Sequence, residues 1–207
     1  MSLEKISAHL SSELSPELST SNKVDKYGLK QKKLPPVELW DPPYCGEINL
    51  VIKANGDWFY EGSIFKRLSL VRLLASVLIR EVYDNAKNAE DTKEKEAYFL
   101  VTPVEKIKIT VEDAPFVLTQ WFWTDDKQTH MHVKTNVGDE FILDADHPMT
   151  ISDDGHLYVT VRRNLMAKVH RNVFYQWVDL GQEQKTDKGT ELVFVSADKA
   201  FRLGALD

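Results

Sequence analysis

The sequence lacks the long apolar segments that membrane and secreted proteins carry. No run of residues approaches the ~20 apolar positions that a membrane-spanning helix needs. The N-terminal residues include Glu4 and Lys5 and continue into polar residues, so they do not resemble the apolar core of a signal peptide. We therefore expect a soluble cytoplasmic protein without a membrane partner.

Cysteine is almost absent, and the common catalytic motifs are missing. The single cysteine, Cys45, excludes an intramolecular disulfide and a cysteine-rich zinc site. It follows two prolines at the entrance of an expected strand, where a small buried thiol is more common than a nucleophile. The chain also lacks GxGxxG, GxxxxGK(S/T), GxSxG and HExxH. These absences favour a protein that is not an enzyme, and we expect no cofactor.

Charge of one sign accumulates in only one segment. The net charge is −6, and the whole excess lies in residues 112–147, where 8 acidic residues are accompanied only by Lys127 and Lys134. Nucleic-acid-binding proteins usually show the reverse, a basic stripe that displaces counterions from phosphates. The only basic cluster lies near the N-terminus and consists of Lys23, Lys26, Lys30, Lys32 and Lys33. We therefore expect no nucleic-acid partner.

The pattern of apolar residues divides the chain into an arm and two units. Residues 1–35 are rich in serine, lysine and glutamate, and we expect them to form a mobile polar arm. The first unit, 36–113, opens with a predicted hairpin around Asn55-Gly56. A helix with Ser69 as its N-cap follows. Its apolar positions recur at helical spacing and are Leu70, Leu73, Leu74, Val77 and Leu78.

The second unit, 114–207, repeats the order of strand, turn, strand, helix and strand. The strands expected between the two helices lie at 97–102, 104–112, 116–123, 129–135, 139–143 and 156–161. Asp154-Gly155 predicts a turn, and Asn164 predicts the cap of the second helix. The apolar positions of that helix are Met166, Val169, Val173, Trp177 and Leu180, and a strand at 191–196 follows.

This recurrence indicates a degenerate duplication of a strand–turn–strand–helix–strand unit. The backbone of 47–106 is then expected to superpose on that of 148–199, with 84–96 as an insertion in the first copy. Strands clustered around two helices predict an α+β protein with mainly antiparallel sheet.

Two histidines provide the first candidate site. His130 and His132 are two apart, so on a strand they lie on one face. A turn with Gly138 in the left-handed region opposes Val133 to Phe141 and Lys134 to Glu140, and places Asp144 opposite His130. His130, His132 and Asp144 could hold a metal ion, with a further ligand from Glu140, Asp146 or His147. An ordinary solvated strand face has the same pattern, and it is the alternative interpretation.

Aromatic and arginine residues provide the second candidate site. Trp58 and Tyr60 begin the return strand of the first hairpin, and Arg67 and Arg72 flank the start of the first helix. Together they could line a pocket for an anion or a peptide carboxylate. Aromatic residues at strand spacing also pack into cores, which is the competing interpretation.

Five ordered motifs resemble a known bacterial family, the domain of unknown function 1285. They are CGEI at 45–48, WFYEGS at 58–63, LVRLLASVL at 70–78 after Arg67, YFLVTPVEK at 98–106 and VEDAPF at 111–116. The resemblance covers about 40–180, and the arm, the 84–96 segment and the C-terminal end depart from it. It implies two related units of α/β-roll and β-roll type. It implies no established activity, and only a suggested role in signalling or regulation.

The resemblance carries over no catalytic residue. Glu105 and Glu112, like Arg67 and Arg72, lie at matching positions, where they could form structural ion pairs or belong to a site. We expect a non-enzymatic binding or regulatory protein, with its ligand or partner site between the two units and a protein or small molecule as partner. The alternatives are a metal-dependent enzyme that uses the His130/His132 face and a structural module that self-associates into a homo-oligomer through strand edges.

Overall fold

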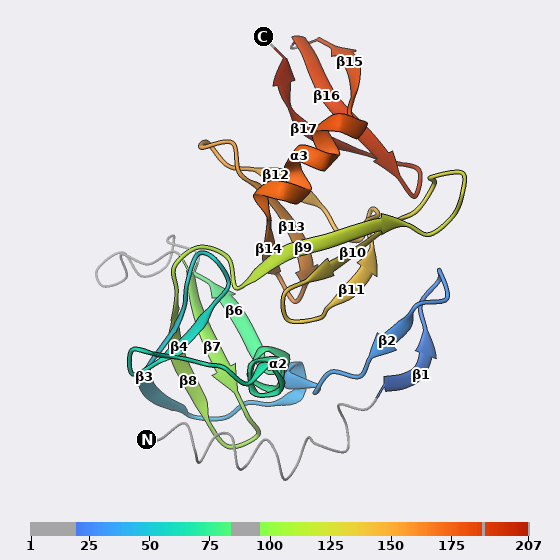
Figure 1. Cartoon of the computed structure of the whole chain (residues 1–207). Coiled ribbons are helices and arrows are strands. Elements are labelled where there is room, and N and C mark those ends of the chain that lie inside the picture. Colours follow the sequence, from blue (N-terminus) through green and yellow to red (C-terminus); the bar gives the residue numbers. More distant parts are fainter. Residues whose placement is uncertain (1–19, 84–95, 188, 207) are drawn as a thin grey trace. The chain divides into compact units, whose positions relative to one another are not determined.

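The structure is a computed structural model that describes residues 20–83, 96–187 and 189–206. The chain divides into two compact units, 1–113 and 114–207, which are described separately (Figure 1). Predictions for 1–19 and for the 84–96 insertion fall almost wholly outside the described residues. No helix in the described ranges is long and apolar enough to cross a membrane.

The N-terminal part of unit 1 contains a small hairpin. Strands β1 (Thr20–Val24) and β2 (Lys30–Lys32) pair in antiparallel fashion. The carboxylate of Asp25 accepts hydrogen bonds from the backbone N–H groups of Tyr27 and Leu29, which closes the connecting turn. An isolated two-stranded hairpin is at best marginally stable in water. Part of the expected arm therefore has secondary structure, and its mobility stays a prediction.

The main sheet of unit 1 has six strands in the order β5-β4-β3-β8-β7-β6. All neighbouring strands are antiparallel except β3 and β8, which are parallel. A 3-10 turn, η1 (Val37–Leu39), precedes the sheet. The strands are β3 (Tyr44–Ile52), β4 (Trp58–Tyr60), β5 (Ser63–Ile64), β6 (Leu78–Val82), β7 (Glu96–Val101) and β8 (Lys106–Val111).

Helix α2 (Leu68–Ser76) connects β5 to β6 and buries one side of its surface, including Leu74. Its ends differ from the prediction. Arg67, not Ser69, is the N-cap residue, and its side chain makes no capping hydrogen bond. The helix stops at Ser76 because the next residues, from Leu78, pair with β7 as strand β6. Tertiary pairing thus overrides the helical spacing of Val77 and Leu78.

Unit 2 contains a second six-stranded sheet, in the order β11-β10-β9-β14-β13-β12. Strands β9 and β14 are parallel, and the other neighbours are antiparallel. The strands are β9 (Phe116–Trp123), β10 (Met131–Thr135), β11 (Glu140–Ile142), β12 (Met149–Ile151), β13 (Leu157–Arg162) and β14 (Leu165–Val169).

The second helix starts later than the sequence predicted. Arg163 and Asn164 have φ values of 49° and 61°, and such paired left-handed residues form the tight turn of a hairpin. Asn164 therefore joins β13 to β14, and its prediction as a helix cap is wrong. Helix α3 (Arg171–Leu180) has His170 as its N-cap, whose ring accepts a hydrogen bond from the Asn172 backbone N–H. Its buried side is formed by Val173 and Trp177.

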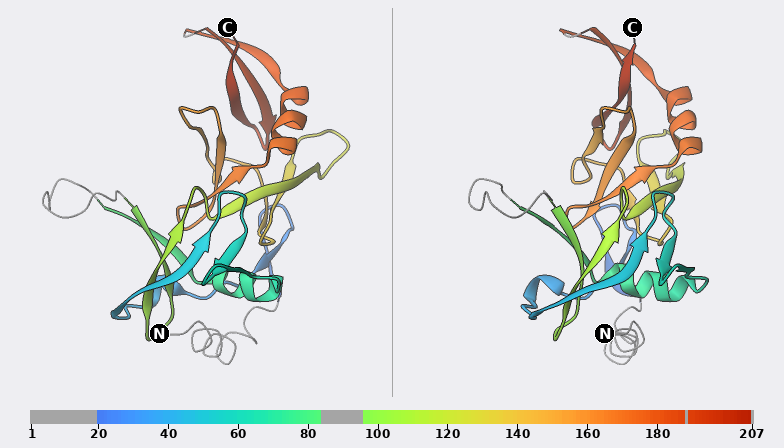
Figure 2. Two further views of the ribbon diagram at one scale, coloured as in Figure 1. Left: turned by 60° about the vertical axis from the view of Figure 1, so that its left-hand side comes forward. Right: turned by 90° about the vertical axis from the view of Figure 1, so that its left-hand side faces the viewer.

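The C-terminal strands form a small antiparallel sheet in the order β15-β16-β17. They are β15 (Gln182–Thr186), β16 (Gly189–Ser196) and β17 (Lys199–Leu206), and Figure 2 shows them beside α3. The buried hydroxyl of Ser196 joins this sheet to the larger one. It donates to the Leu143 carbonyl at 2.6 Å and accepts from the Met131 N–H at 2.9 Å.

The α+β class with mainly antiparallel pairing is confirmed, and each six-stranded sheet is accompanied by one helix. In unit 1, three strands (β3–β5) precede α2 and three (β6–β8) follow it, whereas in unit 2 six strands (β9–β14) precede α3 and three (β15–β17) follow it. The pairing differs, because the last three strands join the main sheet in unit 1 but form their own sheet in unit 2. The superposition of 47–106 on 148–199 stays a prediction.

We expect Gly181→Ala to destabilise the fold by about 1–3 kcal/mol, because added atoms overfill a packed site. A Cβ on Gly181 would lie 2.5 Å from Leu192 Cγ, while its φ of −63° suits any residue. Urea unfolding measures the change in the free energy of unfolding. Gly204→Ala is the control, because its Cβ would meet nothing within 4 Å. Equal stability of the two variants would contradict the prediction.

Candidate functional site

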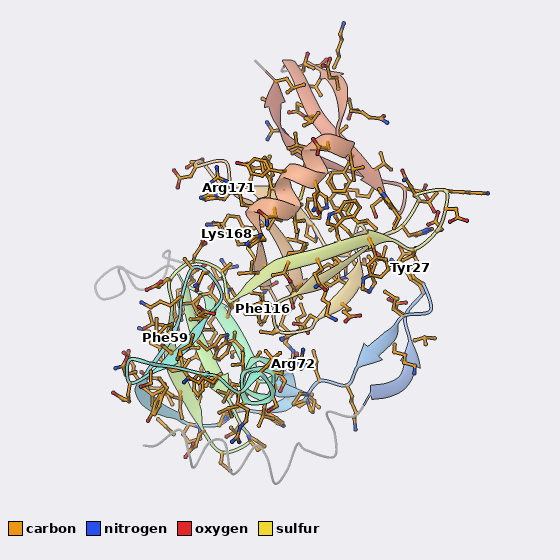
Figure 3. All side chains as sticks on the ribbon, in the orientation of Figure 1. Tyr27, Phe59, Arg72, Phe116, Lys168 and Arg171 are labelled. Carbon is orange, nitrogen blue, oxygen red and sulfur yellow. The ribbon has the colours of Figure 1, made fainter. Side chains whose placement is uncertain are left out.

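The cations at and before α2 lack carboxylate partners among the described residues, unlike the cations of the unit 1 sheet. Each lysine or arginine on the six-stranded sheet of unit 1, and in the turn between β3 and β4, has a carboxylate partner; the pairs are Lys53–Glu112, Arg80–Glu96, Lys106–Glu81 and Lys108–Glu47. Lys66, Arg67 and Arg72 are exposed, and they form no ion pair with another described residue. Figure 3 labels Arg72 at α2. We call these three side chains the α2 cation surface.

The aromatic residues predicted beside these arginines have different environments. Trp58 on β4 is only 2% exposed, and its indole Nε1 is buried without a hydrogen-bond acceptor in the described part of the chain. Tyr60 is half-buried and stacks on Phe65, with ring centroids 6.5 Å apart. Trp58 therefore belongs to the core, whereas Tyr60 remains accessible.

The two predicted glutamates form local contacts. Glu112 accepts hydrogen bonds from Lys53 Nζ and from the Ala54 N–H, and the bond from Lys53 lowers the pKa of its carboxyl below the ordinary value. The backbone N–H of Glu105 donates to the Thr102 hydroxyl in the turn between β7 and β8. The six predicted ligand-binding residues thus lie on β4, at α2, in this turn and after β8. Whether they bind a ligand stays a prediction.

The histidine hairpin has the register that the sequence predicted. Val133 pairs with Phe141 and Lys134 with Glu140 across β10 and β11, and Gly138 has a φ of 85°. His132 is only 3% exposed, so it does not belong to a solvated face. Its ring stacks on Phe122 at 4.4 Å, and its Nε2 lies 3.5 Å from Glu140 Oε2.

His130 lies at the loop between β9 and β10, where a carboxylate organises the backbone. Asp125 accepts hydrogen bonds from the N–H and hydroxyl of Thr129 and from the N–H of His130. The His130 Nδ1 lies 3.4 Å from Asp125 Oδ2. Burial acts to raise the pKa of Asp125, but the hydrogen bonds from Thr129 and His130 outweigh it and lower the pKa to about 2.

Asp144, the predicted partner of the histidines, is buried and accepts a hydrogen bond from the Asp146 N–H. Within residues 20–83, 96–187 and 189–206, no group of three or more His, Cys, Asp or Glu side chains is placed to hold a metal ion. Metal binding by His130 and His132 stays a prediction.

Sequence reasoning missed a surface on β9. Trp121 and Trp123 pack edge to face with centroids 5.9 Å apart, and both are half-buried. The Trp121 indole donates to Gln176 Oε1 of α3 at 2.7 Å. Phe122, between them, is 54% exposed. The signal was the uninterrupted WFW run, because three consecutive aromatic residues place large rings on both faces of a strand.

We expect Asp125→Asn to lower the melting temperature near pH 6, with the difference shrinking as pH falls from about 4 to about 2. The folded-state pKa of about 2 lies below the ordinary value of ~3.9. The ionised carboxylate therefore stabilises the fold above pH ~4, and this contribution is lost as pH falls through the folded-state pKa. Thermal unfolding at several pH values measures this difference in melting temperature. The control is Asp126→Asn, which changes the exposed neighbouring residue. A pH-independent difference would contradict the assignment.

Comparison with known proteins gives consistent matches along most of the chain. The N-terminal domain model of DUF1285, a domain of unknown function, matches residues 35–86, and the C-terminal domain model matches 115–203. The second match continues well beyond 180, so the expectation of a poorly matching C-terminal end is wrong. No curated protein matches the chain.

Two solved structures are also similar. A DUF1285 family protein from Shewanella baltica OS155 is 28% identical, with a TM-score of 0.48 over 63% of this chain and 90% of that one. A DUF1285 family protein from Silicibacter pomeroyi DSS-3 is 31% identical, with a TM-score of 0.68. That match covers 93% of this chain and 94% of the other. With both domain models matched and this relative aligned over nearly its whole length, the chain belongs to the DUF1285 family.

Proposed function

We propose that this protein is a non-enzymatic binding protein with a regulatory role, and that its α2 cation surface recognises an anionic group of a ligand or partner. The observation that carries the proposal is the contrast between paired and unpaired cations in unit 1. The four sheet-side cations have carboxylate partners, whereas Lys66, Arg67 and Arg72 have none among the described residues. Exposed cations without carboxylate partners attract an anion from solution.

The chemistry of the surface supports a carboxylate or a phosphate as the group bound. Arginine offers a planar fork of N–H donors that matches both anions, and two of the three cations are arginines. The first turn of α2 contains no acidic residue, so the positive end of the helix dipole adds to the attraction.

Exposed apolar residues adjoin the same surface. Ile64 and Leu68 are 44% and 46% exposed, and they flank Lys66 and Arg67 in the chain. Leu68 and Arg72 are four residues apart, so they lie on one side of the helix. A ligand with an anionic group beside an apolar group would therefore contact both kinds of side chain.

We expect the double variant Arg67→Glu/Arg72→Glu to bind a fluorescein-labelled hexaglutamate peptide at least about tenfold more weakly than the parent, because two charge-assisted contacts become repulsive. Fluorescence anisotropy at low salt measures the affinity. Competition by inorganic phosphate and by acetate distinguishes a phosphate site from a carboxylate site, because only the matching anion displaces the peptide at millimolar concentration.

The matched control is Lys185→Glu/Lys199→Glu, which changes the net charge equally at two exposed residues of unit 2. It should bind the peptide like the parent. Equal weakening by both double variants would show attraction to net charge alone, and it would contradict the proposal. Circular dichroism spectra of the variants confirm that each is folded.

A further inference from the structure

Strand β9 has an open edge within unit 2. Strand β14 pairs with β9 only along Phe116–Leu118, whose partners on β14 are the residues from Ala167 to Val169. The last contact is the His170 N–H, which donates to the Leu118 carbonyl at 3.0 Å before the chain turns into α3. Strand β9 continues to Trp123, as its long arrow in Figure 1 shows. No described strand pairs with residues 119–123 on that side.

The register shows which backbone groups this edge presents. The Leu143 N–H donates to the Met131 carbonyl, so Met131 directs its backbone groups toward β11. His132 and Lys134 therefore direct theirs toward β9, where they pair with Phe122 and Gln120. Alternation along β9 leaves the N–H and C=O groups of Trp121 and Trp123 pointing away from β10, toward the open edge.

A β-bulge accounts for the change of partner along β9. Thr135 pairs with Leu118 and Lys134 with Gln120, so Thr119 is an extra residue in β9. A bulge reverses the alternation and increases the local twist. Before the bulge, the Leu118 carbonyl points to the β14 side and accepts the hydrogen bond from His170. Beyond it, Gln120 is paired with β10, and the odd-numbered tryptophans face outward.

Aromatic side chains border both faces of the open edge. The Trp121–Trp123 pair lies on the face of the sheet that α3 approaches, where the Trp121 indole bonds to Gln176. Phe122 lies on the opposite face and is 54% exposed. A strand added here would place its alternate side chains against these two aromatic groups.

Acidic residues occur in the loop that follows β9 and on α3. Asp126 is exposed in the loop that follows Trp123, and Asp125 beside it has a carboxyl that is ionised at neutral pH. Asp179 is exposed on α3, three residues after Gln176, and therefore on the side of the helix that reaches Trp121. Cations are attracted both by these carboxylates and by the faces of the aromatic rings.

We propose that the edge of β9 from Thr119 to Trp123 binds an extended, lysine- or arginine-rich segment of a protein partner as an added strand. Backbone hydrogen bonds to Trp121 and Trp123 supply the pairing, and alternate basic side chains contact the rings and carboxylates. This site lies wholly in unit 2 and takes a cationic partner. It is therefore independent of the α2 cation surface, and neither proposal depends on the other.

The test uses the full chain and the peptide acetyl-Arg-Val-Arg-Val-Arg-Val-amide. Site-resolved amide hydrogen exchange by NMR, with and without peptide, should show at least tenfold slower exchange at the Trp121 and Trp123 N–H groups. The N–H groups of Gln120 and Phe122 should change little, because they already pair with β10. Protection at another strand edge, or at none, would overturn the proposal.

Two matched comparisons separate strand addition from simple charge attraction. A peptide N-methylated at every second residue keeps its charge but cannot complete the pairing, and it should lose binding. Asp179→Lys should weaken binding of the unmodified peptide at least fivefold, whereas Asp153→Lys, at another exposed residue of unit 2, should not. Equal binding of both peptides overturns the proposal. So does slow exchange at Trp121 and Trp123 that depends on protein concentration without peptide, because the occupant is then a second copy.

Discussion

A parallel strand pair at the centre of each six-stranded sheet determines how the rest of the chain is arranged. Parallel neighbours cannot be joined by a tight turn, so the chain needs a long crossover connection to return to the starting end of the sheet before the second strand begins. In unit 1 the connection from β3 to β8 contains α2. In unit 2 the connection from β9 to β14 contains only strands, and α3 follows afterwards. Helix α2 therefore lies between the two parallel strands of its sheet in the sequence, whereas α3 follows the second parallel strand of its sheet.

Both candidate surfaces follow from these connections. Because α2 lies within a crossover, it starts shortly after the short edge strand β5, and Arg67 and Arg72 form no ion pair with any described residue. Because α3 starts directly after β14, it ends the pairing of β14 with β9 after three residue pairs. The first surface is cationic and the second acidic and aromatic, so the two suit ligands of opposite charge.

Local patterns predicted those features of the fold that depend on neighbours in the chain. The register of Val133 against Phe141 could be derived because a short turn and a two-residue period leave few alternatives. The end of α2 could not, since Leu78 fits a helical stripe and is drawn into the sheet by a strand that lies far along the chain. Asn164 was mistaken for a cap because asparagine suits both a helix start and a left-handed turn. The open edge of β9 depends on which strands pair, and no local pattern encodes that.

The buried hydroxyl of Ser196 has a consequence for the order in which unit 2 can fold. It satisfies the Met131 N–H and the Leu143 carbonyl, which precede it by 65 and 53 residues. Until β16 has been synthesised and has left the ribosome, these two backbone groups of the larger sheet lack their native partner. That sheet cannot complete its native hydrogen bonding as its own strands emerge, and the closing steps of its folding wait until β16 has been translated.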